Sequence, residues 1–205
     1  MQLFITGTDT NIGKTLICSW LCLQTGYSYC KPIQTGTDSE QDAATVVILS
    51  GSTVYPEQYS FKAPLSPHLA SALENQVIEM TTIQLPDSPD LIVEGAGGLL
   101  VPLNQSDCLI DFIQYLKIPV ILVASSQLGT INHTLLSLEA LKNRSIPTLG
   151  VIMNGPVNPD NCHAITFYGK TTVLAQVPVI APMTQENLKK IPLTTALQAL
   201  LSRSP

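Results

Sequence analysis

The sequence is poor in charged residues. Asp, Glu, Lys and Arg make up 12% of its 205 residues, about half the usual share. The ten Lys and Arg residues are spread along a chain of formal net charge -5, so no basic stripe is available to neutralise a nucleic-acid backbone. We therefore expect no nucleic-acid partner. Apolar residues reach 45%, which suits an α/β protein whose parallel strands are covered on both faces.

Long apolar runs and paired cysteine motifs are also missing. No run approaches the roughly 18 residues of a membrane span, and the chain enters a strand-like stretch without a basic leader and cleavage site. We expect a cytoplasmic protein with no membrane partner. The five cysteines are odd in number and lack C-x-x-C spacing, so neither a disulfide framework nor a zinc site is indicated. Cys18 and Cys22, four residues apart in a helical pattern, are predicted to lie in the core.

Apolar runs alternate with helical patterns along the chain. Strands are predicted at 2–6, 27–31, 90–94, 119–124, 148–153 and 172–180, and helices at 15–25, 42–50, 66–74, 106–116, 132–144, near 161–168 and at 193–202. This alternation predicts one α/β domain over residues 1–205, with a doubly wound, mostly parallel sheet of the P-loop NTPase type. The Pro-rich stretches 56–67 and 155–159 are predicted to be ordered surface loops.

Polar or glycine-rich clusters follow five of the predicted strands. They lie at 7–14, 31–36, 94–98, 125–132 and 154–156. Because the carboxyl ends of parallel strands meet at one edge of the sheet, we expect these clusters to lie together where open α/β folds bind ligands.

The stretch GTDTNIGKT, residues 7–15, predicts a phosphate-binding loop. Gly7 and Gly13 let backbone N–H groups point inward, and the following helix adds the positive end of its dipole. Lys14 is predicted to neutralise β- and γ-phosphate oxygens, and Thr15 to bind Mg²⁺. The spacing G-x5-GKT is one residue longer than usual, but the strand–loop–helix context is met. We predict that a nucleotide is bound by loop residues Asp9, Thr10, Asn11, Ile12, Gly13, Lys14 and Thr15.

Three charged residues outside this loop suit the same chemistry. Glu94 stands at the end of an apolar strand, as a direct or water-mediated Mg²⁺ ligand would, although a carboxylate there can also simply cap a turn. Asp42 begins a helical run, which by itself is an ordinary place for an acid. Lys31 lies at a strand end facing the phosphate loop, where it suggests phosphoryl transfer to a bound acceptor; a solvated lysine is the alternative. Gly97 and Gly98 leave room for the backbone to approach a ligand.

Seven segments occur in the order and spacing of one known family: TGTDTNIGKT, KPIQTG, QDAA, APLSPHLAS, VEGAGG, PVILVASSQLGTINH and MNGP. They extend over nearly the whole chain, which therefore resembles the dethiobiotin synthetases. The resemblance implies an ATP-dependent carboxylation and ring closure in biotin biosynthesis. In that reaction 7,8-diaminononanoate and CO₂, supplied as bicarbonate, form a cyclic urea through a carbamate and its mixed anhydride with phosphate.

The resemblance also implies roles for particular residues. Lys14, Lys31 and Thr10 would be catalytic, and Mg²⁺ would be bound by Thr15, Asp42 and Glu94. The substrates would contact Thr10, Lys31, Thr35, Gly97, Gly98, Gly129, Thr130 and Asn132.

Two further loops complete the predicted site. The loop QLGTINHTLL offers backbone N–H groups around Gly129 and Thr130, at a helix start suited to the substrate's tail carboxylate. In the family this loop serves the neighbouring subunit, so the resemblance implies a homodimer with active sites at the interface. Asn154, followed by Gly155, resembles the family's adenine-binding residue, because an amide matches the donor and acceptor of the adenine N6/N7 edge.

Some positions depart from the family pattern. Asn11 stands where the family commonly has an acid, and Gln127 stands where it often has Lys. The family also has a Tyr that contacts substrate near the position of Thr166, and Tyr168 is a candidate to replace it. The three histidines show no metal-ligand spacing and are predicted to be structural: His68, His133 and His163.

Two other protein classes share a P-loop. Partition-type nucleotide-switch ATPases act through protein partners, but they carry a signature lysine five residues before the last lysine of the loop, where this chain has Asp9. Cobyrinate-type amidotransferases carry an attached glutaminase domain, for which 205 residues leave no room. Both are less favoured than the synthetase.

Overall fold

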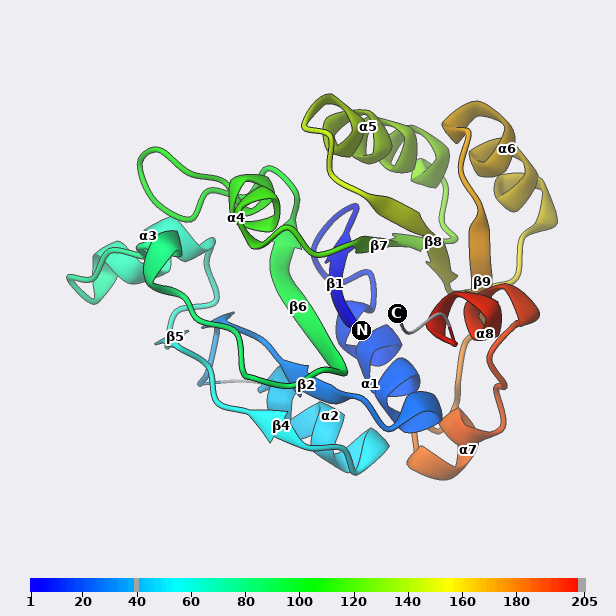
Figure 1. The fold of residues 1–205 in the computed structure, drawn as a ribbon, viewed down its shortest axis with the longest axis horizontal. Coiled ribbons are helices and arrows are strands. Elements are labelled where there is room, and N and C mark those ends of the chain that lie inside the picture. The colour runs from blue at the N-terminus through cyan, green and yellow to red at the C-terminus, as the bar shows by residue number, and fades with distance from the viewer. Residues whose placement is uncertain (39–40, 203–205) are drawn as a thin grey trace.

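A parallel β-sheet lies at the centre of the molecule. The computed structural model describes residues 1–38 and 41–202, and Figure 1 shows the sheet between layers of helices. The strands are β1 (Gln2–Gly7), β2 (Ser28–Cys30), β3 (Ile33–Thr35), β4 (Val54–Tyr55), β5 (Tyr59–Phe61), β6 (Leu91–Gly98), β7 (Val120–Ser125), β8 (Thr148–Asn154) and β9 (Val173–Val177). The helices are α1 (Lys14–Thr25), α2 (Asp42–Ser50), α3 (Pro67–Leu73), the 3-10 helix η1 (Met80–Thr82), α4 (Leu109–Leu116), α5 (Thr130–Asn143), α6 (Pro159–Gly169), α7 (Gln185–Lys189) and α8 (Thr195–Leu201).

The main sheet has the strand order β4-β2-β6-β1-β7-β8-β9, and all of its neighbouring strands are parallel. This confirms the predicted α/β class and doubly wound sheet. β1 is the central strand. β7, β8 and β9 follow it outward on one side, whereas on the other side β6 lies between β1 and the earlier strand β2. The carboxyl ends of β1, β2 and β6 therefore meet at one edge, where a ligand crevice is expected.

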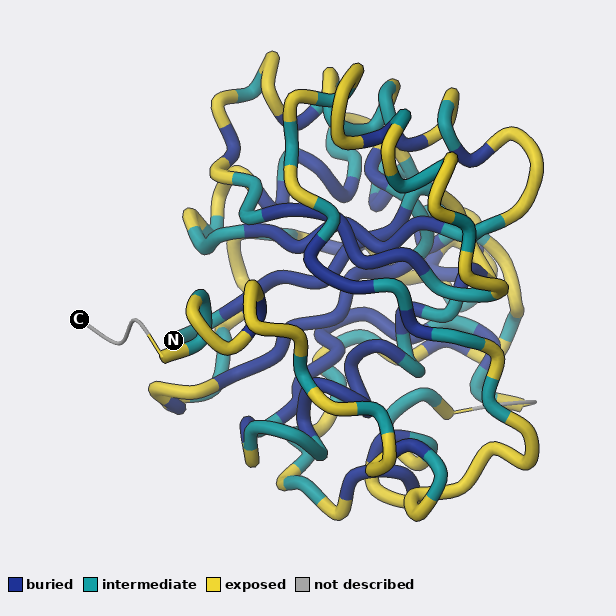
Figure 2. The backbone as a smooth tube through the Cα atoms, turned by 90° about the vertical axis from the view of Figure 1, so that its right-hand side faces the viewer, coloured by how far each residue is buried: buried dark blue, intermediate teal, exposed yellow. Residues whose placement is uncertain are grey.

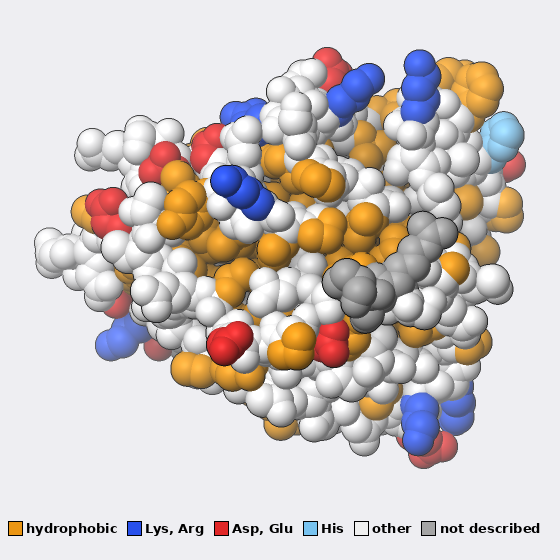
Figure 3. Space-filling model, viewed as in Figure 1, with side chains coloured by type: hydrophobic (Ala, Val, Ile, Leu, Met, Phe, Trp, Pro, Cys, Tyr) orange, Lys and Arg blue, Asp and Glu red, His pale blue; other side chains and the backbone are white. Residues whose placement is uncertain are grey.

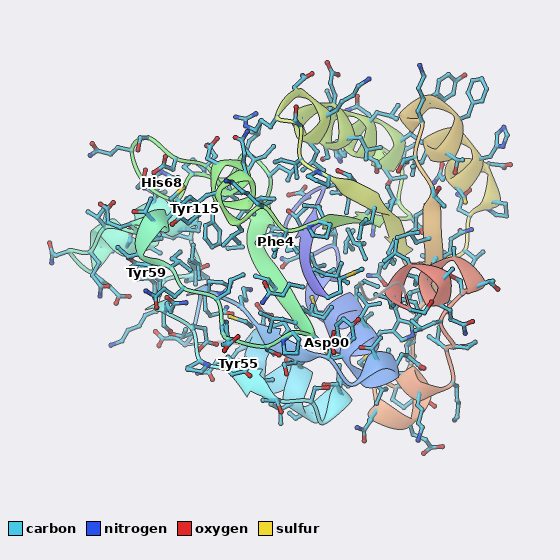
Figure 4. The ribbon with its side chains drawn as sticks, viewed as in Figure 1. Phe4, Tyr55, Tyr59, His68, Asp90 and Tyr115 are labelled. Atoms are coloured by element: carbon cyan, nitrogen blue, oxygen red, sulfur yellow. The ribbon has the colours of Figure 1, made fainter. Side chains whose placement is uncertain are left out.

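Successive residues of β1 pack against opposite helix layers. Leu3 and Ile5 share a core with α1, α2, α7 and α8, whereas Phe4 belongs to the core formed with α3 and α4. The Phe4 ring meets Phe112 of α4 edge-on at a centroid distance of 6.3 Å, and Figure 4 shows Phe4 beside β6. Figure 2 shows that buried stretches of the backbone run through the middle of the molecule, and most residues of β1, β6 and β7 are buried. Burial on both faces explains why these strands read as continuous apolar runs.

The structure corrects several element boundaries. The stretch 56–67 is not only a loop, because it contains β5, which pairs in parallel with β3 in a second, two-stranded sheet. β4, η1 and α7 were not predicted, and the last strand ends at Val177, short of the predicted residue 180. β6 continues to Gly98, where it pairs with Gly7 after a register shift. Glu94 therefore lies within a strand and not at its end.

The surface carries few charges. On the face shown in Figure 3, Lys and Arg side chains stand apart and form no stripe. Within residues 1–38 and 41–202, no helix combines the length and apolarity needed to cross a membrane.

Cys18 and Cys22 are fully buried in the core, as predicted. The domain predicted over residues 1–205 includes 39–40 and 203–205, which lie outside the described residues.

Candidate active site

The phosphate loop joins β1 to α1 and contains two residues with positive φ. Gly13 caps α1 with φ 91°, and Asn11 also has a positive φ of 56°. Glycine adopts this left-handed region without penalty, and asparagine tolerates it better than most residues. A Cβ atom at Gly13 would lie 2.1 Å from Nδ2 of Asn154, so that position has no room for a side chain. Glycine is thus required at Gly13 by conformation and by packing.

Lys14 folds back over the loop that precedes it. Its Nζ donates a hydrogen bond of 2.9 Å to the backbone oxygen of Asp9, and the residue is only 7% exposed. Burial lowers the pKa of Lys14 below its ordinary value, with Lys31 acting in the same direction and Glu94 against it. The protein itself therefore stabilises the charge of the Lys14 ammonium group poorly, and an anion bound in the loop would stabilise it.

Two carboxylates converge on the hydroxyl of Thr15. Its Oγ1 lies 2.9 Å from Oδ1 of Asp42 and 2.9 Å from Oε1 of Glu94. The three residues come from the first turn of α1, the start of α2 and the middle of β6. A single hydroxyl proton cannot fully satisfy two carboxylates, whereas three hard oxygen donors suit Mg²⁺. The donor set therefore fits the predicted metal.

Lys31 pairs with the same two carboxylates. Its Nζ contacts Oδ2 of Asp42 and lies 3.6 Å from Oε1 of Glu94. Burial alone would lower the pKa of Lys31, but the two carboxylates raise it above its ordinary value. Burial alone would likewise raise the pKa of Asp42, yet Lys31 holds it below its usual range. Both groups therefore remain charged inside the protein.

Tyr29, which sequence reasoning did not assign to the site, holds Glu94 from behind. It is fully buried and donates a 2.9 Å hydrogen bond from its hydroxyl to Oε2 of Glu94. Burial, followed by the charge of Glu94, raises the pKa of both Tyr29 and the buried Cys18 thiol well above ordinary values. The one sequence signal for Tyr29 is its spacing: it precedes Lys31 by two residues, so both side chains lie on the same side of the extended chain. Apart from this spacing, a tyrosine in a strand cannot be distinguished from an ordinary core residue.

A cleft of about 700 Å³ opens in front of these groups. The loop before α3 forms one wall of it, through Pro64, Leu65, Ser66 and Pro67. Gly97, with φ 71°, lies on another wall, where a Cβ would come within 3.5 Å of Oγ1 of Thr10. The structure thus brings together most of the predicted phosphate, metal and substrate residues, namely Thr10, Asn11, Gly13, Lys14, Thr15, Lys31, Thr35, Asp42, Glu94 and Gly97.

Other predicted residues do not line this cleft: Asp9, Ile12, Gly98, Gly129, Thr130, Asn132, Asn154 and Gly155. Gly129 caps α5 with φ 96°, and the hydroxyl of Thr130 donates a 2.5 Å hydrogen bond to the backbone oxygen of Ser125. Beside them Leu128 is fully exposed, at 106%. Within one chain the loop at the start of α5 therefore does not line the cleft.

Asn154 links β8 to the phosphate loop. Its Nδ2 donates a 2.9 Å hydrogen bond to the backbone oxygen of Ile12. The adjoining Gly155 has φ 122° and packs beside Ser126. Through this hydrogen bond Asn154 holds the phosphate loop in place, a role separate from its predicted contact with adenine.

The histidines and the tyrosine substitute lie elsewhere. His68 of α3, labelled in Figure 4, places Nδ1 3.1 Å from the Ser66 hydroxyl, and His163 stacks on Phe167 at a centroid distance of 6.3 Å. Thr166 and Tyr168 are exposed on α6 and do not line the cleft.

Comparison with known proteins gives consistent matches. A family model described as an AAA domain matches residues 1–187. The ATP-dependent dethiobiotin synthetase BioD of Lawsonia intracellularis is 55% identical over 200 residues, covering 98% of both chains. The enzyme of the same name from Paramagnetospirillum magneticum is 42% identical, covering 92% of this chain and 93% of its own.

Solved structures resemble the fold at low sequence identity. A ParA family ATPase from Chlorobium tepidum has a TM-score of 0.51 and 14% identity, covering 98% of this chain and 93% of its own. The MinC:MinD complex of Aquifex aeolicus has a TM-score of 0.54 and 9% identity, covering 100% and 97%. Likeness at this identity shows the fold alone.

Proposed function

This chain belongs to the family of ATP-dependent dethiobiotin synthetases, and on that basis we propose how its residues carry out the reaction. The enzyme catalyses the ATP-dependent ring closure that forms dethiobiotin in biotin biosynthesis. The observation that carries the residue assignments is the convergence of Lys14, Lys31, Asp42 and Glu94 around Thr15 at the phosphate loop. The partition-type alternative is not favoured.

The proposed reaction has three bond-forming steps. One amine of 7,8-diaminononanoate adds to CO₂ and loses a proton, which gives a carbamate. A carbamate oxygen attacks the γ-phosphorus of ATP, and ADP leaves. The second amine then attacks the carbonyl carbon of this mixed anhydride, a proton and phosphate leave, and the cyclic urea closes. Because the substrate supplies both nucleophiles, the protein needs none and acts by positioning and charge stabilisation.

Phosphate binding falls to the loop and Lys14. Asn11 and the start of α1 offer N–H groups to the phosphates. The N–H of Thr10 donates to Oδ1 of Asp9 at 2.7 Å in the free protein and would have to exchange that partner for a phosphate oxygen. Phosphate oxygens would replace the backbone oxygen of Asp9 as the partner of Lys14 Nζ. Asn154 and Gly155 extend the proposed nucleotide site toward the base.

Mg²⁺ is proposed to bind at Thr15, Asp42 and Glu94. When bound, it would supply positive charge that neutralises the negative charge developing during transfer. No group of three or more His, Cys, Asp and Glu side chains suited to a metal occurs within residues 1–38 and 41–202. Two carboxylates and a hydroxyl nevertheless fit Mg²⁺, which usually takes its remaining ligands from phosphates and water.

Lys31 is proposed to exchange partners during binding. In the free protein Asp42 and Glu94 hold its ammonium group. A cation bound to those carboxylates would weaken their hold, and Lys31 would then be available to the carbamate, with Thr10 and Thr35 as neighbouring hydroxyl donors in the same cleft.

The tail carboxylate is proposed to bind at the start of α5 in a neighbouring subunit of a homodimer. The argument is that Gly129 and Thr130 do not line the cleft of their own chain, while the adjacent Leu128 is fully exposed. An interface in this region would cover Leu128 and bring the helix N-terminus to a second cleft. The enzyme is proposed to act in the cytoplasm.

Mixing of two inactive variants tests the shared site. Lys14→Ala removes a phosphate contact, and Gly129→Val is incompatible with the positive φ at the start of α5. If sites combine residues of two subunits, mixed dimers contain one intact site, and an equimolar mixture regains roughly a quarter of wild-type activity. No recovery after subunit exchange would contradict the arrangement.

ADP release tests the proposed chemistry. We expect release to depend strongly on the presence of both diaminononanoate and bicarbonate, because the phosphoryl acceptor is the carbamate and not water. ADP release at the same rate without the diamine would instead indicate a nucleotide switch.

A further inference from the structure

Gln34 is a buried amide in the wall of the active-site cleft. It lies in the middle of β3, is 4% exposed, and lines the cleft with Lys31, Thr35 and Asp42. Its Nε2 donates a 2.8 Å hydrogen bond to the backbone oxygen of Thr35. Its Oε1 is buried and has no hydrogen-bond partner in the described part of the chain.

The orientation of this amide is fixed by its neighbour. The backbone oxygen of Thr35 is an acceptor, so it selects the NH₂ end of the amide. Exchanging the oxygen and nitrogen would set the amide oxygen against another oxygen at 2.8 Å. The unpartnered acceptor is thus a consequence of local chemistry.

A buried carbonyl oxygen without a donor is unfavourable, and a ligand that brings an N–H group removes that cost. ATP phosphates offer only acceptors to this part of the cleft. The diamine and its carbamate offer N–H donors, and Gln34 lies between the two residues proposed to hold the carbamate, Lys31 and Thr35.

We propose that Oε1 of Gln34 accepts a hydrogen bond from an amine or carbamate N–H of the substrate, and so selects the diamine and orients it. This inference rests on the proposed function. An amide oxygen is too weak a base to take a proton, so Gln34 binds the nitrogen without deprotonating it. The proton lost during ring closure leaves by another route.

The test compares Gln34→Met, which keeps the length of the side chain but removes the acceptor, with Gln58→Met. Gln58 is an exposed residue just before β5, outside the cleft, and both ends of its amide are hydrogen-bonded to Gln84. We expect Gln34→Met to raise the KM for the diamine about tenfold or more, as the loss of one good hydrogen bond predicts. The KM for ATP and the Mg²⁺ concentration giving half-maximal rate should stay within about twofold, and Gln58→Met should resemble wild type.

Other outcomes overturn the assignment. A shift in the Mg²⁺ dependence would show that Oε1 serves metal-bound water, and an equal rise in both KM values would indicate a structural role. Should Gln34→Met fail to fold, Gln34→Asn, which withdraws the oxygen by one bond, provides the same comparison. If wild type makes no cyclic urea, the proposed function fails; if wild type turns over and the Gln34 variant keeps its KM for the diamine, only the role of Gln34 fails.

Discussion

The hydroxyl of Tyr29 donates a 2.9 Å hydrogen bond to Oε2 of Glu94, and these two residues are 0% and 2% exposed. β2 and β6 are neighbouring strands, so this hydrogen bond joins side chains of two adjacent strands. It leaves Oε1 of Glu94 to face Thr15 and Lys31. Tyr29 is thus a positioning residue for the carboxylate proposed to bind Mg²⁺.

Tyr29→Phe should destabilise the protein and weaken metal binding. The substitution leaves a buried carboxylate oxygen without its donor, which costs about 1.5–3 kcal/mol of unfolding free energy. Loss of such a supporting contact typically lowers metal affinity about tenfold or more. Urea unfolding and a Mg²⁺ titration measure the two effects.

Tyr55→Phe is the matched control for this substitution. Tyr55 lies on the adjacent strand β4 and is labelled in Figure 4; its hydroxyl makes no hydrogen bond within the described residues. A loss of Mg²⁺ affinity as large in Tyr55→Phe as in Tyr29→Phe would show that the Tyr29–Glu94 bond is not the cause.

Gly13→Ala should abolish ATP binding, whereas Gly26→Ala should not. Both glycines have a positive φ, 91° and 75°, but only Gly13 faces a close neighbour, Asn154 Nδ2 at 2.1 Å from the added Cβ. Gly26→Ala therefore measures backbone strain alone, about 1 kcal/mol. Calorimetric titration with ATP and thermal unfolding separate the two effects, and normal ATP affinity in Gly13→Ala would contradict the described loop.

ATP affinity should fall as pH rises toward the alkaline range. The pKa of Lys14 is lowered by burial, so in the free protein its ammonium loses a proton at a pH below the ordinary pKa of lysine. Phosphates prefer the charged form, and affinity therefore decreases as pH rises through this lowered pKa. Lys31, whose pKa is raised, stays charged over the same window.

By the same linkage, the unfolded chain binds more protons than the native state between the lowered and ordinary pKa, so the Lys14 contribution to stability rises with pH there. Lys14→Gln should lose both dependences. ATP affinity and the free energy of unfolding, measured as a function of pH for wild type and variant, check the direction of both changes. If the ATP affinity of Lys14→Gln followed the wild-type pH profile, another group would be responsible for the effect.

Lys31→Met should lower turnover while strengthening Mg²⁺ binding to the nucleotide-free protein. Charge stabilisers of phosphoryl transfer contribute on the order of 10³-fold in rate, and removing the ammonium leaves Asp42 and Glu94 without their counter-cation. Steady-state rates and Mg²⁺ calorimetry test the two halves. Lys62→Met, at an exposed lysine after β5, is the control, and near wild-type turnover in Lys31→Met would remove Lys31 from the mechanism.

The phosphate loop was predictable because a short motif fixes its own conformation. Gly13, Lys14 and Thr15 act through backbone geometry and a helix start that are local in sequence. Asp42 was a weak signal, since its value depends on meeting Glu94 and Lys31, and that meeting depends on the strand order β2-β6-β1. Alternation of strands and helices predicts a parallel sheet but does not specify that order.

Other features were outside the reach of pattern reasoning. β3 and β5 have three residues each, too few to show a period. β6 passes beyond Glu94 through Gly95, Gly97 and Gly98, residue types that strands usually exclude. Tyr29 and Gln34 act through the direction of one side-chain atom toward a distant neighbour, which composition and spacing do not encode.

The most direct measurement follows the carbon of labelled bicarbonate. With ATP, Mg²⁺ and 7,8-diaminononanoate, the account predicts that label appears in the cyclic urea, with one ADP formed for each ring closed, and that omitting the diamine suppresses ADP formation. ATP hydrolysis that continues without the diamine and leaves no label in a urea would contradict it.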